Sequence, residues 1–186
     1  MALFSCASGQ NGFTAAELAL INEADSIMRV LTVEDEKDLE VLRAQSTDLP
    51  FSALVSEEYK KLTDIMLATV THPSQDGVGI AAPQVGINRR VVAVQRFDKE
   101  GDPFEVYPNI RIVWKSDSVE AGPEGCLSVP NQRGDVMRSQ EIVIEYASVG
   151  GSEERIRETV KGFTAVIFQH EVDHLDGVLY IDRLEL

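Results

Sequence analysis

The chain has 186 residues, enough for one domain around a single hydrophobic core. Hydrophobic residues make up 44% and charged residues 26%, as in ordinary globular proteins, and no apolar run approaches the roughly 18 residues of a membrane-spanning helix. With 31 acidic against 17 basic residues, the net charge of -14 excludes a broad basic surface for nucleic acid or anionic lipid.

The chain has only two cysteines, Cys6 and Cys126, too few for the disulfide framework of a small secreted domain. Its start has neither the basic nor the apolar region of a complete signal peptide. We therefore expect a soluble cytoplasmic protein whose first residues form a disordered leader. Residues 3–6 resemble the end of a bacterial lipoprotein signal, so a lipoprotein-type N-terminus at Cys6 is the less favoured alternative.

Three helices are predicted in the N-terminal third. Thr14 and Glu17 match a capping box, in which the threonine bonds to the amide three residues on while the glutamate reaches back. The helix that they open is predicted to run to about Met28. Apolar residues at helical spacing predict two further helices, over residues 35–45 and 56–71.

After Pro73 the pattern changes to short β-branched runs separated by Gly, Pro and Asn. Strands are predicted at residues 90–96, 107–114, 140–146 and 155–160. A last helix is predicted over residues 162–175 from the spacing of its apolar residues. The expected fold class is α+β, with short β-sheets packed around this C-terminal helix and further helices in the N-terminal third.

The last predicted helix contains the segment Gln169-His170-Glu171-Val172-Asp173-His174. Histidines four residues apart lie on one face of a helix, so His170 and His174 can bind a single metal ion. Glu171 can reach a water molecule beside that metal, as the glutamate of H-E-x-x-H hydrolases does. The remaining histidine, His72, stands before a proline at a helix end and is interpreted as a capping or solvated residue.

A catalytic metal usually has three protein ligands and one open position. The best candidate for the third ligand is Cys126, within Glu124-Gly125-Cys126-Leu127-Ser128, where the glycine favours a tight, exposed turn. A lone cysteine is more often a buried, inert residue than a metal ligand. Here the presence of the histidine pair favours the metal ligand.

A third notable segment is Gly77-Val78-Gly79-Ile80-Ala81-Ala82-Pro83-Gln84. Taken alone, it fits a tight loop or the turn that enters a helix. It has neither the G-x-G-x-x-G spacing nor the lysine of a phosphate loop, so nucleotide binding is not expected.

Together, and in this order, the three segments resemble the motifs of the peptide deformylases. The resemblance covers about residues 62–184 and includes Gln132-Arg133-Gly134 and the segment 175–179 after the histidines. Three ordered motifs are far more specific than any one of them.

The resemblance implies a metal-dependent hydrolase that removes the formyl group from the N-terminal formylmethionine of new bacterial or organellar chains and releases formate. The metal ligands would be Cys126, His170 and His174. The single divalent metal would be Fe²⁺, with Zn²⁺, Ni²⁺ or Co²⁺ as alternatives that ligand chemistry alone does not distinguish. Glu171 would be the general acid and base.

The resemblance also assigns the groups around the substrate. The side-chain amide of Gln84 and the backbone N–H of Leu127 would face the oxyanion. The peptide would lie extended against Val78 and Gly79, where small residues allow close approach. Further substrate contacts would come from Gly125, Arg133, Phe163 and Val166.

Several of these residues could instead have an ordinary structural role. Val78, Phe163 and Val166, which would hold the methionine side chain, fit ordinary core packing equally well. Arg133 and Arg138 could be surface charges, although Arg138 is expected to pair with Asp173 behind the metal ligands.

The sequence departs from the family at both ends. It stops twelve residues after His174, without the basic C-terminal helix that some relatives dock on the ribosome, so at most a transient ribosome contact is expected. The leader is longer than usual. We therefore divide the chain into an N-terminal extension, residues 1–27, and a peptide deformylase-like catalytic domain, residues 28–186, and make no prediction of its oligomeric state.

Three other functions stay open at this point. A zinc endopeptidase would share the H-E-x-x-H motif but take its third ligand downstream, where Glu185 is available. An amidohydrolase could act on a different formylated substrate. A metal-holding module without turnover is disfavoured because binding alone needs neither Glu171 nor Gln84.

Overall fold

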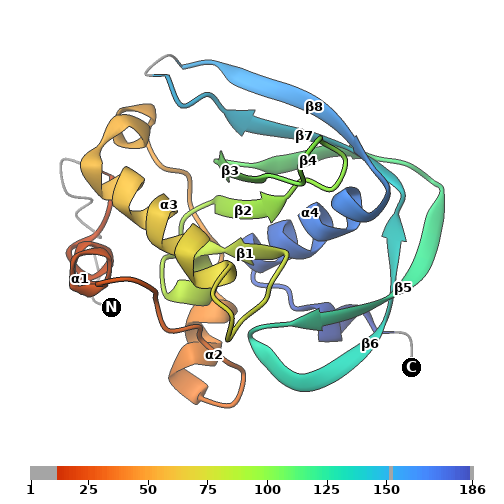
Figure 1. Cartoon of the computed structure of the whole chain (residues 1–186), viewed down its shortest axis with the longest axis horizontal. Coiled ribbons are helices and arrows are strands. Elements are labelled where there is room, and N and C mark those ends of the chain that lie inside the picture. The colour runs from red at the N-terminus through yellow and green to blue at the C-terminus, as the bar shows by residue number, and fades with distance from the viewer. Residues whose placement is uncertain (1–11, 151–152, 185–186) are drawn as a thin grey trace, which may run out of the picture.

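The computed structural model describes residues 12–150 and 153–184, so Cys6 lies outside the described residues. The N-terminal part contains helices α1 (Ala15–Glu23), α2 (Glu36–Leu42) and α3 (Glu57–Val70), and α4 (Gly162–Leu175) follows the strands (Figure 1). Short 3₁₀ helices lie at Phe51–Val55, Ala82–Val85 and Tyr180–Arg183. None of the helices in these residues is long and apolar enough to cross a membrane.

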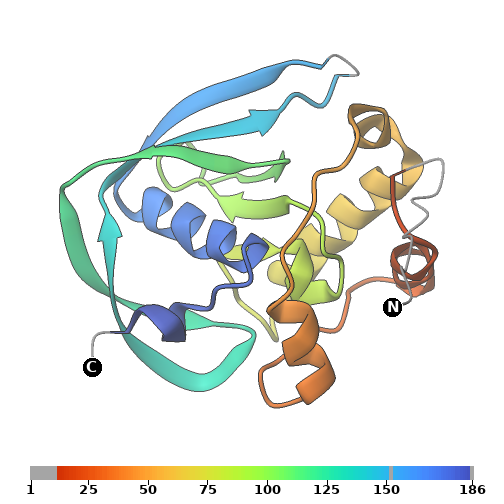
Figure 2. The ribbon, with the colours of Figure 1, turned by 180° about the vertical axis from the view of Figure 1, so that it is seen from behind.

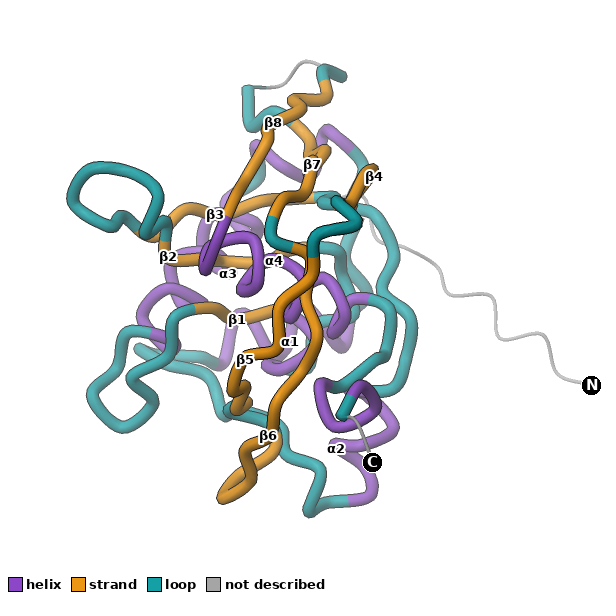
Figure 3. Tube along the Cα trace, turned by 90° about the vertical axis from the view of Figure 1, so that its right-hand side faces the viewer, coloured by secondary structure: helices purple, strands orange, loops and turns teal. Residues whose placement is uncertain are grey.

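The strands form small antiparallel sheets. One has the order β1-β2-β3 and consists of Gly79–Ala81, Val91–Gln95 and Phe104–Pro108. Another has the order β4-β7-β8 and consists of Arg111–Lys115, Glu141–Ala147 and Arg155–Lys161. Strands β5 (Val119–Cys126) and β6 (Val129–Ser139) form a two-stranded pair, which Figure 3 shows as a long ribbon descending past β1.

Helix α4 packs against both three-stranded sheets. Its residues Ala165, Phe168 and Leu175 are fully buried in one apolar cluster with Val92 of β2 and Ile142 of β7, and Figure 1 shows the helix in the middle of the molecule. The predicted α+β class is therefore confirmed, including the short sheets around the C-terminal helix. The observed bounds of this helix also match the predicted ones.

The prediction for the first helix is wrong at its C-terminal end. The capping box is present, since Glu17 N donates to Thr14 Oγ1 and Thr14 N to Glu17 Oε2, but α1 ends at Glu23 rather than near Met28. Beyond it, backbone amides donate to neighbouring segments instead of to the preceding turn, for example from Leu31 N to Gln84 O at 2.8 Å. These tertiary bonds satisfy the backbone without a helix.

Helix α2 is also shorter than predicted and ends at Leu42 rather than Gln45. The side-chain amide of Asn88 donates to the carbonyls of Val41 and Ala44, at 3.0 and 3.4 Å. A distant residue thus satisfies the carbonyls at the end of this helix.

The single strand predicted at residues 107–114 is in fact two strands in different sheets. Asn109 between them has a φ of 53°, a left-handed conformation that interrupts a strand, and its side chain bonds to both backbone groups of Leu49. Strands β1, β5 and β6 were not predicted. Strand β1 has only three residues, and much of the β5–β6 pair is exposed, so the hydrophobic alternation is weak.

The segment before residue 28 packs into the hydrophobic core. Phe13 and Ile21 are fully buried in the same cluster as Leu62 of α3. Glu17 forms an ion pair of 2.8 Å with Arg89, and both side chains are almost buried. Apolar burial and a hydrogen-bonded ion pair therefore hold α1 against the rest of the chain.

We expect Ile21→Ala to lower the free energy of unfolding by about 2–4 kcal/mol, because it leaves a cavity in the core. The neighbouring Leu20 is 42% exposed, so Leu20→Ala is the matched control and should cost less than about 1 kcal/mol. Urea denaturation followed by circular dichroism measures both. Equal losses would show that the buried face does not hold α1 in place.

Candidate metal centre

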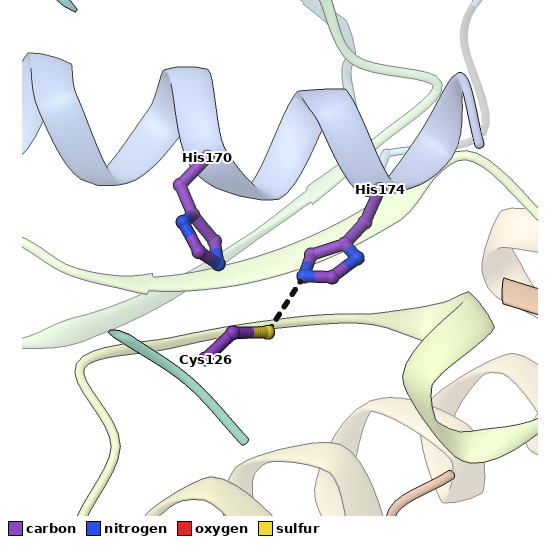
Figure 4. Close-up of side chains that lie close together, drawn as sticks. All are labelled: Cys126, His170 and His174. Atoms are coloured by element: carbon purple, nitrogen blue, oxygen red, sulfur yellow. Dashed lines mark hydrogen bonds between the residues drawn. The ribbon is translucent and has the colours of Figure 1, made fainter. Parts of the chain in front are cut away.

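Cys126, His170 and His174 come together as a group whose ligand atoms all lie within 4.8 Å of one another. Figure 4 shows both imidazoles projecting from α4 toward the cysteine, with Cys126 Sγ 3.2 Å from His174 Nε2. Ligand atoms around a tetrahedral metal with bonds of about 2.0–2.3 Å lie about 3.3–3.8 Å apart. A thiolate and two imidazoles at this spacing fit one divalent metal ion.

Two elements of secondary structure position these ligands. Helix α4 places the histidines one turn apart, with their ring centroids 5.1 Å from each other. Cys126 ends β5 just after a register shift between Glu124 and Cys126, and such an irregularity re-aims the side chain that follows it.

A carboxylate supports the first histidine. Glu124 Oε2 lies 2.8 Å from His170 Nδ1, and because the carboxylate can only accept, the ring donates from Nδ1 and leaves Nε2 free for a metal. Although burial opposes it, hydrogen bonds from Arg138 and His170 lower the pKa of Glu124 to about 2. Sequence reasoning gave Glu124 no role, although it stands only two residues before Cys126.

The predicted pairing of Arg138 with Asp173 is confirmed. Arg138 donates to Asp173 Oδ2 at 2.6 Å and to Glu124 Oε1 at 2.7 Å. Asp173 also accepts two hydrogen bonds from Arg183, which sequence reasoning missed. A chain of buried ion pairs therefore runs from His170 to the C-terminal end of α4.

Glu171 is buried on the cavity side of the histidines. Its carboxylate lies against Gly79 so closely that a Cβ atom there would stand 2.5 Å from Glu171 Oε1. Its Oε2 atom has no hydrogen-bond partner among the described residues. Burial raises the pKa of Glu171 to about 7, against the opposing charge of His170. A carboxyl group with such a pKa suits proton transfer near neutral pH.

Gln84 has a fixed side-chain orientation. Its Oε1 atom accepts from Ala81 N at 2.9 Å, so its Nε2 atom points the other way. That nitrogen donates to Ser128 Oγ at 3.2 Å and lies 3.5 Å from Cys126 Sγ. The amide therefore presents its hydrogens beside the metal ligands.

A cavity of about 750 Å³ opens next to this group. It is lined by all the predicted site residues except the deeply buried His174, namely Val78, Gly79, Gln84, Gly125, Cys126, Leu127, Arg133, Phe163, Val166, His170 and Glu171. The three motifs, far apart in the sequence, thus meet at one place.

The exposure of the cavity walls decides between the alternatives for the apolar residues. Val78 is 36% and Phe163 57% exposed, so plain core packing is wrong for both.

Arg133 extends over Gly125, with its Cγ atom 3.4 Å from where a Cβ atom would stand on that glycine. His72 is exposed and bonds to Ser74, as predicted for a solvated residue.

A cysteine and two histidines beside an open cavity, with a buried carboxylate next to them, define a metal-dependent hydrolase. Comparison with known proteins narrows this class. Residues 27–186 match the family model described as polypeptide deformylase. A peptide deformylase of Caulobacter vibrioides is 38% identical over 161 residues, which cover 86% of this chain and 88% of the relative. One from Halothermothrix orenii is 39% identical over 130 residues, covering 70% and 80%.

Solved structures agree with these matches. Peptide deformylase from Thermotoga maritima has a TM-score of 0.74 at 34% identity, covering 87% of this chain and all of that one. The Acinetobacter baumannii class I type b enzyme with Met-Ala-Ser bound has the same score and identity, covering 85% and 98%. The chain belongs to the peptide deformylase family, whose reaction removes the formyl group from an N-terminal formylmethionine.

We expect Gly79→Ala to lower kcat/KM about 100-fold, because the new methyl group would displace the Glu171 carboxylate and a misplacement of about 1 Å has this cost. Gly122→Ala is the matched control, since nothing lies within 4 Å of its Cβ position. Formate release measures both variants. An unchanged rate for Gly79→Ala would show that the carboxylate position does not depend on this contact.

We expect Glu124→Gln to weaken metal binding about 10–100-fold, as loss of a carboxylate behind a ligating histidine does. Glu120→Gln, an exposed substitution on the same strand, serves as the control. Competition with a chelator measures both affinities. Equal affinities in the two variants would remove Glu124 from the support of His170.

Proposed function

We propose that this chain deformylates N-formylmethionyl peptides in the bacterial cytoplasm with Fe²⁺ as its metal, and that Glu171 carries the proton. The observation that supports this proposal most directly is the buried Glu171 carboxylate between Gly79 and the metal ligands, facing the cavity. The Cys-His-His donor set suits Fe²⁺ and also accommodates Zn²⁺, Ni²⁺ or Co²⁺.

Cys126, His170 and His174 would hold a divalent metal, which would supply Lewis acidity for the formyl oxygen and a lower pKa for an adjacent water molecule. Glu171 accepts a proton from the attacking water as oxygen adds to the formyl carbon. It then gives this proton to the leaving amine nitrogen as the C–N bond breaks. The products are formate and a free N-terminus.

Two hydrogen-bond donors of the chain stabilise the oxyanion that forms in between. One is the Nε2 group of Gln84, which Ala81 N orients toward the site, and the other is the backbone N–H of Leu127. A preorganised donor of this kind contributes about 3 kcal/mol. Because the Gln84 amide is already oriented, it needs little rearrangement during the reaction.

The peptide binds along strand β1. This strand is at the edge of its sheet, and its residue Gly79 lines the cavity, so the unpaired backbone faces the substrate. An extended peptide can add to such an edge as a further strand. Gly125 and Arg133, which also line the cavity, contact the peptide as well.

The methionine side chain enters the apolar part of the cavity formed by Val78, Phe163 and Val166. The Met-Ala-Ser complex of the Acinetobacter baumannii relative supports a substrate that begins with methionine. We further propose that residues 28–186 form the catalytic domain, that residues 1–27 are an extension which α1 joins to it, and that any ribosome contact is transient.

Nothing specific favours the other candidates. A zinc endopeptidase would need a downstream ligand, and Glu185 lies outside the described residues, whereas Cys126 already completes the group. Fixed orientation of Gln84 is unnecessary for a module that only holds a metal.

Formate release from a formyl-Met peptide by anaerobically prepared, Fe²⁺-loaded protein tests the function. We expect Glu171→Ala to lower the rate by about 10²–10⁴-fold, since it removes the proton carrier, and to keep its metal. Glu57→Ala, an exposed change on α3, is the control. No release by the metal-bound parent protein would overturn the function, and full activity of Glu171→Ala would overturn the role of this residue.

A further inference from the structure

A second hollow of about 440 Å³ lies on the other side of α4 and shares no lining residue with the substrate cavity. Its walls come from the segment after α2, strand β4, the C-terminal end of α4 and the last 3₁₀ helix. Figure 2 shows the segment after α2 passing beside the end of α4, where Ser46 N donates to Leu175 O at 2.8 Å. The catalytic mechanism uses none of this surface directly.

The charge of this hollow is opposite to that of the whole chain. Four cationic side chains line it, against two carboxylates, whereas the chain has 17 basic and 31 acidic residues. The cations are Arg90, Arg111, Lys115 and Arg183, and the carboxylates are Asp173 and Asp176. A concave surface with an excess of one charge concentrates ions of the other sign.

Both carboxylates are already engaged. Asp173 is shared between Arg138 and Arg183, and Asp176 accepts from Arg90 at 2.6 Å. Each of them is therefore already shared with at least one arginine.

The remaining two cations differ: Arg111 donates to Asp48 at 2.9 Å, whereas Lys115 forms no ion pair with any residue that the structure describes. Lys115 is exposed at the end of β4. Partial burial of its ammonium and the charges of Arg183 and Arg138 lower its pKa, against the attraction of Asp173 and Asp176. An anion beside Lys115 would relieve this repulsion.

A buried hydroxyl group in the wall of the hollow is a second, independent indication of a bound ligand. Ser46 lines the hollow and is only 6% exposed, and its Oγ atom has no hydrogen-bond partner among the described residues. An unsatisfied buried polar group is costly and calls for a partner. Because this Oγ atom is covered, the Ser46 side chain would have to turn toward the hollow for an acceptor oxygen of a ligand to supply one.

We propose that this hollow binds the phosphate group of an anionic ligand. Phosphate suits guanidinium forks and a lysine ammonium. The hollow has the size of a small-molecule site, so the group belongs to free phosphate, a phosphorylated metabolite or an RNA backbone. Asp173 is common to the hollow and the ion pairs behind His170, so the ligand lies next to the support of the metal centre.

The proposal can be tested with the full, metal-loaded chain by isothermal titration calorimetry. The probes are inorganic phosphate, a nucleoside monophosphate and a short single-stranded RNA, and the tightest of them identifies the source of the phosphate. We expect Lys115→Glu to weaken binding about tenfold or more and Lys115→Gln to weaken it less, because one reverses and the other only removes a charge.

Lys60→Glu is the matched control, since it changes net charge equally on an exposed part of α3. Its affinity should stay within about twofold of the parent value, because exposed, distant charges are screened. Formate release should be unchanged in all three variants, which shows that they are folded. Absence of saturable binding by all three probes would overturn the proposal, as would equal weakening in Lys60→Glu and Lys115→Glu.

Discussion

The site depends on the neutralisation of one buried guanidinium. Arg138 of β6 is 3% exposed and lies between Glu124 of β5 and Asp173 of α4. An unpaired charge in this interior would cost several kcal/mol, so both carboxylates must stay at its side. The same contacts fix the β5–β6 pair, which carries Cys126, against the helix that carries the histidines. The same ion pairs therefore neutralise the buried charge and hold the metal ligands in position relative to one another.

How much could be predicted from sequence depends on how local each signal is. His170 and His174 were predictable because four residues make one helical turn, and the three motifs identified Cys126 and Gln84 by their order. The contact of Glu124 with His170 and the break at Asn109 depend on partners 46 and 60 residues away, which no local pattern reveals. For the same reason, the end of α2 was misjudged, since Asn88 determines it.

Helix α4 separates two different environments. One side presents His170 and Glu171 to an open cavity with an apolar wall, and the other presents Val172 and Asp173 to a cationic hollow. Asp173 links them indirectly, since it accepts from Arg138 behind the metal ligands and also forms part of the wall of the cationic hollow. Neighbouring positions on one helix thus serve separate surfaces, as the helical period requires.

The packing of α1 has a practical consequence for anyone who shortens the gene. The family match begins at residue 27, and a truncated version starting there would lack Phe13 and Ile21, which fill the core beside α3. It would also leave Arg89, almost buried, without the carboxylate of Glu17. Boundaries drawn from similarity mark what the relatives share, whereas the hydrophobic core of this chain includes Phe13, fourteen residues before the match begins.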